Sequence, residues 1–163
     1  NIDKIYTIEL IKDILNWQES YNREDLECII DNIPNSIRKT YEENNIIYRG
    51  VVANINNLQE DKVCSWTTEY KYAKKFSEQE NYYDTIADQY DEIYSIVFVK
   101  KDRYFNLNKL ISDLKKWIMS NANYLISEMD NTTEEILSRF YEEDEVISDF
   151  RLSNCNIAYM KQW

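Results

Sequence analysis

The chain of 163 residues contains a single glycine, Gly50, and a single proline, Pro34. Because glycine and proline are the usual markers of turns and helix ends, this chain must separate its elements with turns of Asn, Asp and Ser. No internal repeat or low-complexity linker divides the sequence. The length suits one globular domain, so we expect residues 1–163 to form a single domain, with a helical segment over 1–44 and a core over 45–163.

Helical patterns dominate the N-terminal third of the chain. Residues 3–20 carry two apolar seams instead of one, which predicts a helix that is packed on both sides. Two shorter helices are expected over 23–32 and, after Pro34, over 35–43. Three more helices are predicted further along: 69–77, capped by Thr67 or Thr68, then 107–118, and 132–140, which starts with a capping box.

Strand patterns begin after the N-terminal helices. Five segments are expected to form strands: 46–51, 62–67, 93–100, 143–148 and 155–162. The third of them is apolar on both faces, as is typical of a central strand in a sheet. A helical N-terminal region followed by mixed strands and helices predicts an α+β fold.

The charge balance and the residue types exclude several functions. With 19 Lys+Arg against 30 Asp+Glu, the formal net charge is −11, which argues against a surface that binds nucleic acid. The absence of histidine removes Ser-His-Asp and Cys-His catalysis and His-ligated zinc. The longest apolar run is far shorter than the roughly 20 residues needed to span a bilayer, so we expect no membrane insertion. Three cysteines without CxxC spacing favour neither a disulfide scaffold nor a metal site, and they suit a reducing cytoplasm.

Three short motifs occur in order along the strand-rich part of the chain. They are Tyr48-Arg49-Gly50, then Ser65-Trp66-Thr67 with Phe76 on the next helix, and then Glu143-Asp144-Glu145. This order resembles the Arg, Ser-Thr-Ser, Glu-x-Glu pattern of the mono-ADP-ribosyltransferases related to clostridial binary toxins and to phage-encoded enzymes. The resemblance covers residues 46–148. It implies a pair of packed, mainly antiparallel sheets, with NAD bound by the 45–163 core.

Strand geometry supports a site at these motifs. Side chains alternate along a strand, so Ser65 and Thr67 should share one face, and Glu143 and Glu145 should share a face opposite Asp144. Cleavage of the bond between nicotinamide and ribose develops positive charge on the sugar, and a fixed carboxylate stabilises that charge. We assign this role to Glu145, with Ser65 orienting its carboxylate.

The resemblance implies the roles of the remaining residues. It predicts release of nicotinamide and transfer of ADP-ribose to a protein acceptor, most often an arginine, which Glu143 orients and helps to deprotonate. Since an acidic chain repels the two phosphates of NAD, a local cation is needed, and the forked guanidinium of Arg49 suits it. Further contacts are expected from Thr67 and Phe76 to the cofactor, from Tyr82 and Tyr83 in a loop over it, and from Phe140 and Tyr141 to the target protein. No metal is implied, and the enzyme would act in the cytoplasm of its own or an invaded host cell.

Two features depart from the family pattern, and one other function fits the composition. The middle motif is Ser-Trp-Thr, and residues 77–92 contain none of the Arg or Lys residues with which many relatives contact NAD. Taken singly, Arg49 also fits a strand-end surface charge, and residues 142–145 also fit a solvated acidic turn.

The alternative function is an acidic phage-type inhibitor that presents carboxylates in place of phosphates and so blocks a basic partner surface.

Overall fold

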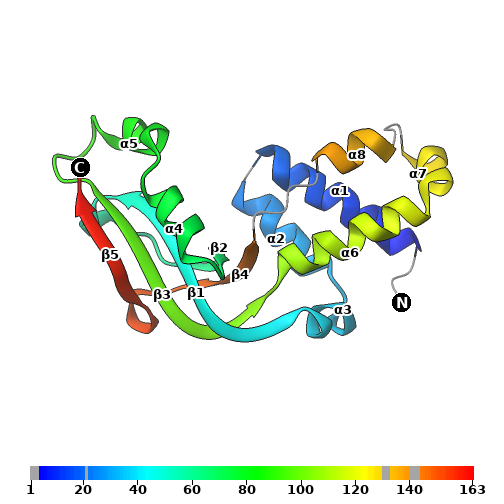
Figure 1. Cartoon of the computed structure of the whole chain (residues 1–163), viewed down its shortest axis with the longest axis horizontal. Helices are drawn as coiled ribbons and strands as arrows, with labels where there is room; N and C mark the ends of the chain where they lie inside the picture. The colour runs from blue at the N-terminus through cyan, green and yellow to red at the C-terminus, as the bar shows by residue number, and fades with distance from the viewer. Residues whose placement is uncertain (1–3, 21, 130–132, 140–143) are drawn as a thin grey trace. The chain divides into compact units, whose positions relative to one another are not determined.

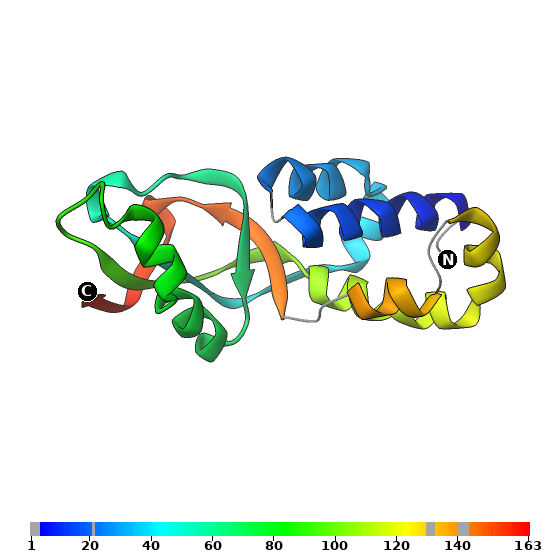
Figure 2. The ribbon, with the colours of Figure 1, turned by 90° about the horizontal axis from the view of Figure 1, so that it is seen from above.

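The computed structural model describes residues 4–20, 22–129, 133–139 and 144–163 (Figure 1, Figure 2). The chain divides into two compact units. One unit combines Asn1–Glu42 with Asn106–Glu142, and the other combines Glu43–Phe105 with Glu143–Trp163. This division differs from the expected 45–163 core, because the helices after residue 106 group with the N-terminal helices instead of with the strands.

The helical unit consists of six helices in the described ranges: α1 (Lys4–Ser20), α2 (Arg23–Asn32), α3 (Asn35–Thr40), α6 (Leu107–Ser120), α7 (Ala122–Glu128) and α8 (Thr133–Arg139). The prediction that the first helix is packed on both sides is confirmed, since α1 buries residues from both seams: Ile8, Ile11 and Leu15 from one, and Leu10, Ile14 and Trp17 from the other. Helix α2 packs against α1, and α8 packs against both α1 and α6. The sequence pattern did not predict α7.

Polar contacts attach α6 to the end of the first helical segment. The Asn106 side chain caps α6 by accepting a hydrogen bond from the Lys109 amide at 2.9 Å. The Asn106 amide donates to the Tyr41 carbonyl at 2.8 Å, and the Tyr41 hydroxyl donates to the Asp113 carboxylate at 2.6 Å. Burial and this carboxylate raise the pKa of Tyr41 well above its ordinary value.

The second unit contains one sheet of five strands: β1 (Glu42–Ala53), β2 (Asp61–Thr67), β3 (Tyr94–Phe105), β4 (Glu145–Phe150) and β5 (Asn156–Gln162). The strand order is β1-β2-β4-β3-β5, and the β1–β2, β2–β4, β3–β4 and β3–β5 pairs are antiparallel. An additional β1–β3 pairing closes four strands into a ring, which β5 extends at the edge of β3. The predicted α+β class is confirmed. The strands nevertheless form one connected sheet where the resemblance implies two packed sheets, because β4 pairs with both β2 and β3.

Side chains from the four strands of the ring form one hydrophobic core: Ile47, Cys64, Trp66, Ile96, Phe98, Tyr104, Val146 and Phe150. Phe150 connects several of them, since its ring centre lies 4.9 Å from that of Phe98 and 6.2 Å from that of Trp66. Burial of this core holds β2 and β4 side by side, and these two strands carry most of the candidate site.

Helix α4 (Tyr70–Ser77) packs against β1 at the single glycine of the chain (Figure 1). A Cβ atom on Gly50 would lie 1.7 Å from the carbonyl oxygen of Ala73, so a larger residue would force the helix away from the strand. The N-cap residue of α4 is Glu69, whose amide donates to the Thr67 hydroxyl at 3.1 Å. The predicted helix is present, but its N-cap is Glu69 and not Thr67 or Thr68, because the helix begins only at Tyr70.

Candidate active site

The candidate site lies where β2 and β4 pair in the sheet unit. In the register of these strands, Ser65 lies opposite Ile147 and Thr67 lies opposite Glu145. Residues that are directly opposed point to the same face of a sheet, so Ser65, Thr67 and Glu145 share one face and Trp66 points to the other. The predicted alternation along Ser65-Trp66-Thr67 is confirmed.

Ser65 and Glu145 are joined by a direct hydrogen bond. The Ser65 hydroxyl donates to Oε2 of Glu145 across a sequence separation of 80 residues. Glu145 is half-buried, and the next two residues of its strand, Val146 and Ile147, are buried. The carboxylate is thus oriented by a hydroxyl and carried by an anchored strand, which is the arrangement that electrostatic stabilisation of a developing charge requires. The catalytic role of the pair stays a prediction.

Arg49 lies in the middle of β1 and is half-buried. Its Nη1 donates a hydrogen bond of 2.7 Å to the carbonyl oxygen of Ser65. Its Cζ lies 5.6 Å from the centre of the Phe150 ring, within the range of a cation–π interaction. Arg49 is therefore not a strand-end surface charge. The guanidinium supports the strand that carries Ser65, and its predicted contact with the phosphates of NAD would have to use the donors that remain.

Asp144 differs from the expectation that it points away from the face of Glu145. Strand β4 begins only at Glu145, and Asp144 has a φ of 53°, in the left-handed region that Asp tolerates better than most residues. Its Oδ2 accepts a hydrogen bond from the Thr67 hydroxyl at 3.2 Å and another from the Thr68 hydroxyl. Strand alternation therefore does not extend through Asp144, so the argument that Glu143 shares the face of Glu145 fails. Glu143 itself lies outside the described residues.

The structure does not place all the predicted residues at β2 and β4. Phe140 and Tyr141 lie outside the described residues, so their predicted role in target recognition stays untested. Phe76 lies on α4 and is half-buried. Tyr82 and Tyr83 lie on helix α5 (Glu80–Ile86), where the resemblance implies a loop. The Tyr83 ring stacks on that of Trp163 at 4.6 Å and 15°, whereas Tyr82 is 46% exposed.

Comparison with known proteins adds no further information on this site. No protein-family model, curated protein or solved structure matches the chain. Within the described ranges, no group of three or more Cys, Asp or Glu residues is arranged to hold a metal ion. None of the described helices is long and apolar enough to cross a membrane. The assignment therefore depends on the geometry and on the motif resemblance.

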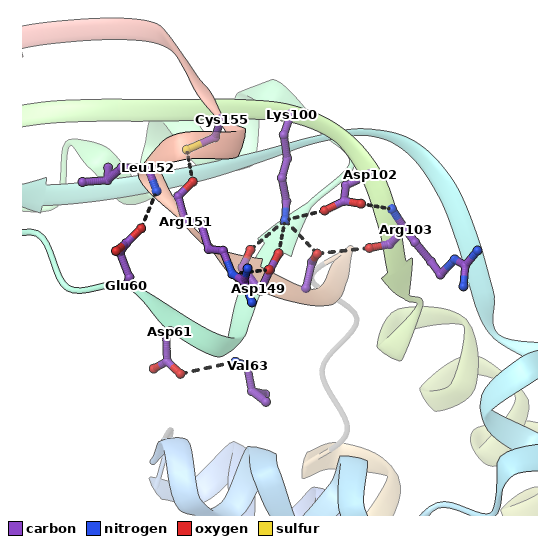
Figure 3. A network of polar contacts seen from close by, with 11 residues as sticks. Glu60, Asp61, Val63, Lys100, Asp102, Arg103, Asp149, Arg151, Leu152 and Cys155 are labelled. Atoms are coloured by element: carbon purple, nitrogen blue, oxygen red, sulfur yellow. Dashed lines mark hydrogen bonds and ion pairs between the residues drawn. The ribbon is translucent and has the colours of Figure 1, made fainter.

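The sequence pattern did not single out Lys100, a buried lysine of the sheet unit (Figure 3). Lys100 is 5% exposed, and its Nζ lies 2.7 Å from Asp149 Oδ1, 3.0 Å from Asp102 Oδ2 and 2.9 Å from Ser148 Oγ. The same ammonium lies 4.8 Å from the Trp66 ring. Its place in the sequence was a usable signal, because a lysine two residues beyond the inward-facing Phe98 continues the buried side of β3.

The contacts of Lys100 lower the pKa of Asp102. Burial alone would raise the pKa of Asp102, but hydrogen bonds from Lys100 and from the Arg103 amide and the charge of Lys100 outweigh it, so that the pKa lies below its ordinary value. Because its ammonium already contacts two carboxylates and a hydroxyl within the sheet unit, Lys100 does not suit the role of the cation that the phosphates of NAD require.

Proposed function

We propose that this chain is an NAD-dependent mono-ADP-ribosyltransferase that modifies a protein side chain, arginine being the expected acceptor, and releases nicotinamide. The observation that carries the proposal is the hydrogen bond between Ser65 and Glu145 across β2 and β4. It brings together two residues from separate motifs in the manner that the resemblance predicts. We also propose that the sheet unit has the fold of this family.

The proposed reaction needs only groups that this sheet unit can supply. The bond between ribose C1′ and the nicotinamide nitrogen breaks, and its electron pair leaves with nicotinamide, which becomes neutral. Positive charge develops on the ribose, and the Glu145 carboxylate stabilises it. A nitrogen of the acceptor then bonds to C1′ and gives up a proton to a base, the role predicted for Glu143. Water in place of the acceptor gives hydrolysis.

The proposal is tested by nicotinamide release from NAD in a carboxylate variant. Glu145→Gln keeps the size of the side chain and can still accept the hydrogen bond of Ser65, but it removes the charge. We expect turnover to fall by about two to four orders of magnitude, as is usual when a transition-state charge is removed. Glu92→Gln, at an exposed position of the same unit, is the matched control and should keep full turnover. Equal turnover in both variants would reject the assignment.

The acidic composition favours one other function, the inhibitor that mimics nucleic acid. A net charge of −11 and exposed carboxylates such as Glu24 at the start of α2 would suit a basic partner surface. This function predicts no nicotinamide release by the wild type, together with displacement of DNA from a basic DNA-binding protein that weakens steeply with salt. Nicotinamide release without such displacement would reject it.

A further inference from the structure

Asp144 ties the start of β4 to the end of β2. Its Oδ2 accepts hydrogen bonds from the Thr67 hydroxyl, at 3.2 Å, and from the Thr68 hydroxyl. Thr67 is 4% exposed and is the register partner of Glu145, the residue that follows Asp144. The contact therefore acts one residue from the candidate carboxylate, at the position where β4 begins.

The backbone of Asp144 is part of the same arrangement. It is the one residue other than glycine in the described ranges with a positive φ, 53°. Such a conformation is unfavourable for most residues and persists where surrounding contacts hold it. Here the two threonine hydroxyls provide those contacts, so the chain turns sharply at Asp144 and enters β4 with Glu145 facing Ser65.

Without this contact, the start of β4 would lose two hydrogen bonds at the residue next to Glu145. Terminal residues of strands open more readily than central ones, and the bond between Ser65 and Glu145 would open with them. A carboxylate displaced by about 1 Å loses much of its effect on a transition state. The cost would appear in the rate of cleavage, because Asp144 contacts the threonines and does not need to contact NAD.

We propose that Asp144 is a positioning residue that sets the orientation of Glu145 through Thr67 and Thr68. The inference rests on the proposed function for its kinetic consequence, but the orientation itself is measurable without turnover. Three substitutions at Asp144 separate the effect of its hydrogen bonds from the effect of its backbone conformation. Asp144→Asn keeps a carbonyl oxygen that can accept both hydroxyls and tolerates the left-handed backbone, Asp144→Gly keeps only the backbone freedom, and Asp144→Ala keeps neither.

The kinetic test compares these variants in NAD cleavage. Asp144→Ala and Asp144→Gly should lower kcat by about 10- to 100-fold and change KM for NAD by less than about threefold, whereas Asp144→Asn should keep kcat within about threefold. Thr68→Val should lower kcat by part of the same factor, and combining it with Asp144→Ala should lower kcat no further than Asp144→Ala alone. A kcat within threefold of wild type in Asp144→Ala, or an equal loss in Asp144→Asn, would overturn the proposal.

Hydrogen exchange of the full chain provides the readout that does not depend on activity. The amides of Val146 and Ile147 should exchange at least about tenfold faster in Asp144→Ala than in Asp144→Asn, while those of β5 stay unchanged. Equal exchange in the two variants would overturn the positioning role, whatever the kinetics. A wild type that releases no nicotinamide, with the exchange difference present, would instead reject the proposed function and leave the positioning of Glu145 by Asp144 supported.

Discussion

At the scale of single residues, the site depends on side chains whose polar atoms are already engaged. Ser65 donates to Glu145 through its side chain and accepts from Arg49 through its backbone. Arg49 contacts the Ser65 carbonyl oxygen through Nη1 and lies over the Phe150 ring. The arginine can thus support the strand with one donor and present others to an anion.

This division of donors predicts the effect of Arg49→Lys. An ammonium carries the charge but cannot bond the Ser65 carbonyl and two phosphate oxygens with the geometry of a planar fork. We expect NAD to bind about tenfold more weakly, which corresponds to about 1.4 kcal/mol. Isothermal titration calorimetry measures this directly. Affinity equal to that of the wild type would show that Arg49 has a purely structural role.

Asp102 predicts how the sheet unit responds to acid. Its pKa in the folded chain lies below the ordinary value of 3.8, so the unfolded chain binds this proton more readily. Its contribution to stability is therefore complete at neutral pH and is lost as the pH falls below about 4 and through the folded-state pKa. Asp102→Asn should flatten the decline in Tm between about pH 5 and pH 3 relative to the wild type. The exposed Asp88→Asn serves as control, and the same decline in both variants would contradict the prediction.

At the scale of elements, the strongest sequence patterns predicted the structure well. The two seams of residues 3–20 and the apolar stripe of residues 107–118 became α1 and α6, because each buries a continuous face. Helices α5 and α7 were missed, since seven residues with scattered tyrosines and asparagines show no clear period. The predicted strands 46–51 and 93–100 were also too short, because pairing with neighbouring strands extends β1 and β3 to 12 residues each.

The contact of β1 with α4 predicts a large effect at Gly50. In Gly50→Ala the new Cβ would meet the backbone carbonyl of Ala73, an atom that cannot rotate away. We expect the free energy of unfolding to fall by about 1–3 kcal/mol, the usual cost of overpacking. Urea denaturation followed by circular dichroism measures it, with Ala158→Val at an exposed strand position as a near-neutral control. Unchanged stability of Gly50→Ala would mean that α4 does not pack on β1 as described.

The attachment of α6 predicts a response to alkali. The folded-state pKa of Tyr41 is raised, so its neutral form is favoured by folding, and its contribution is complete below about pH 10 and lost as the pH rises further. Tyr41→Phe should lower stability at pH 7 but lose less of it between about pH 9 and pH 11 than the wild type. Thermal melts at the two pH values test this, and the exposed Tyr82→Phe is the control. A parallel decline in wild type and Tyr41→Phe would contradict the prediction.

At the scale of the whole molecule, the sequence predicted one contact of the candidate site better than the grouping of the helices and strands. Strand alternation and motif order anticipated the pairing of Ser65 with Glu145. Local patterns could not show that residues 106–142 return to the N-terminal helices, because this depends on contacts between distant segments. They also could not show that Asp144 bonds Thr67 or that Lys100 bonds Asp149, because these partners are far away along the chain and are brought close by strand pairing.

We propose that Ser65 and Glu145 act together in cleaving NAD. The most direct test is a double-mutant cycle on nicotinamide release with the wild type, Ser65→Ala, Glu145→Gln and the combined variant. If Ser65 acts by orienting Glu145, the combined variant should be about as slow as Glu145→Gln alone, while Ser65→Ala alone should be slower than the wild type by roughly 10-fold or more. A wild type that releases no nicotinamide would contradict the claim. So would a combined variant whose rate is lowered by the product of the factors measured for the two single substitutions.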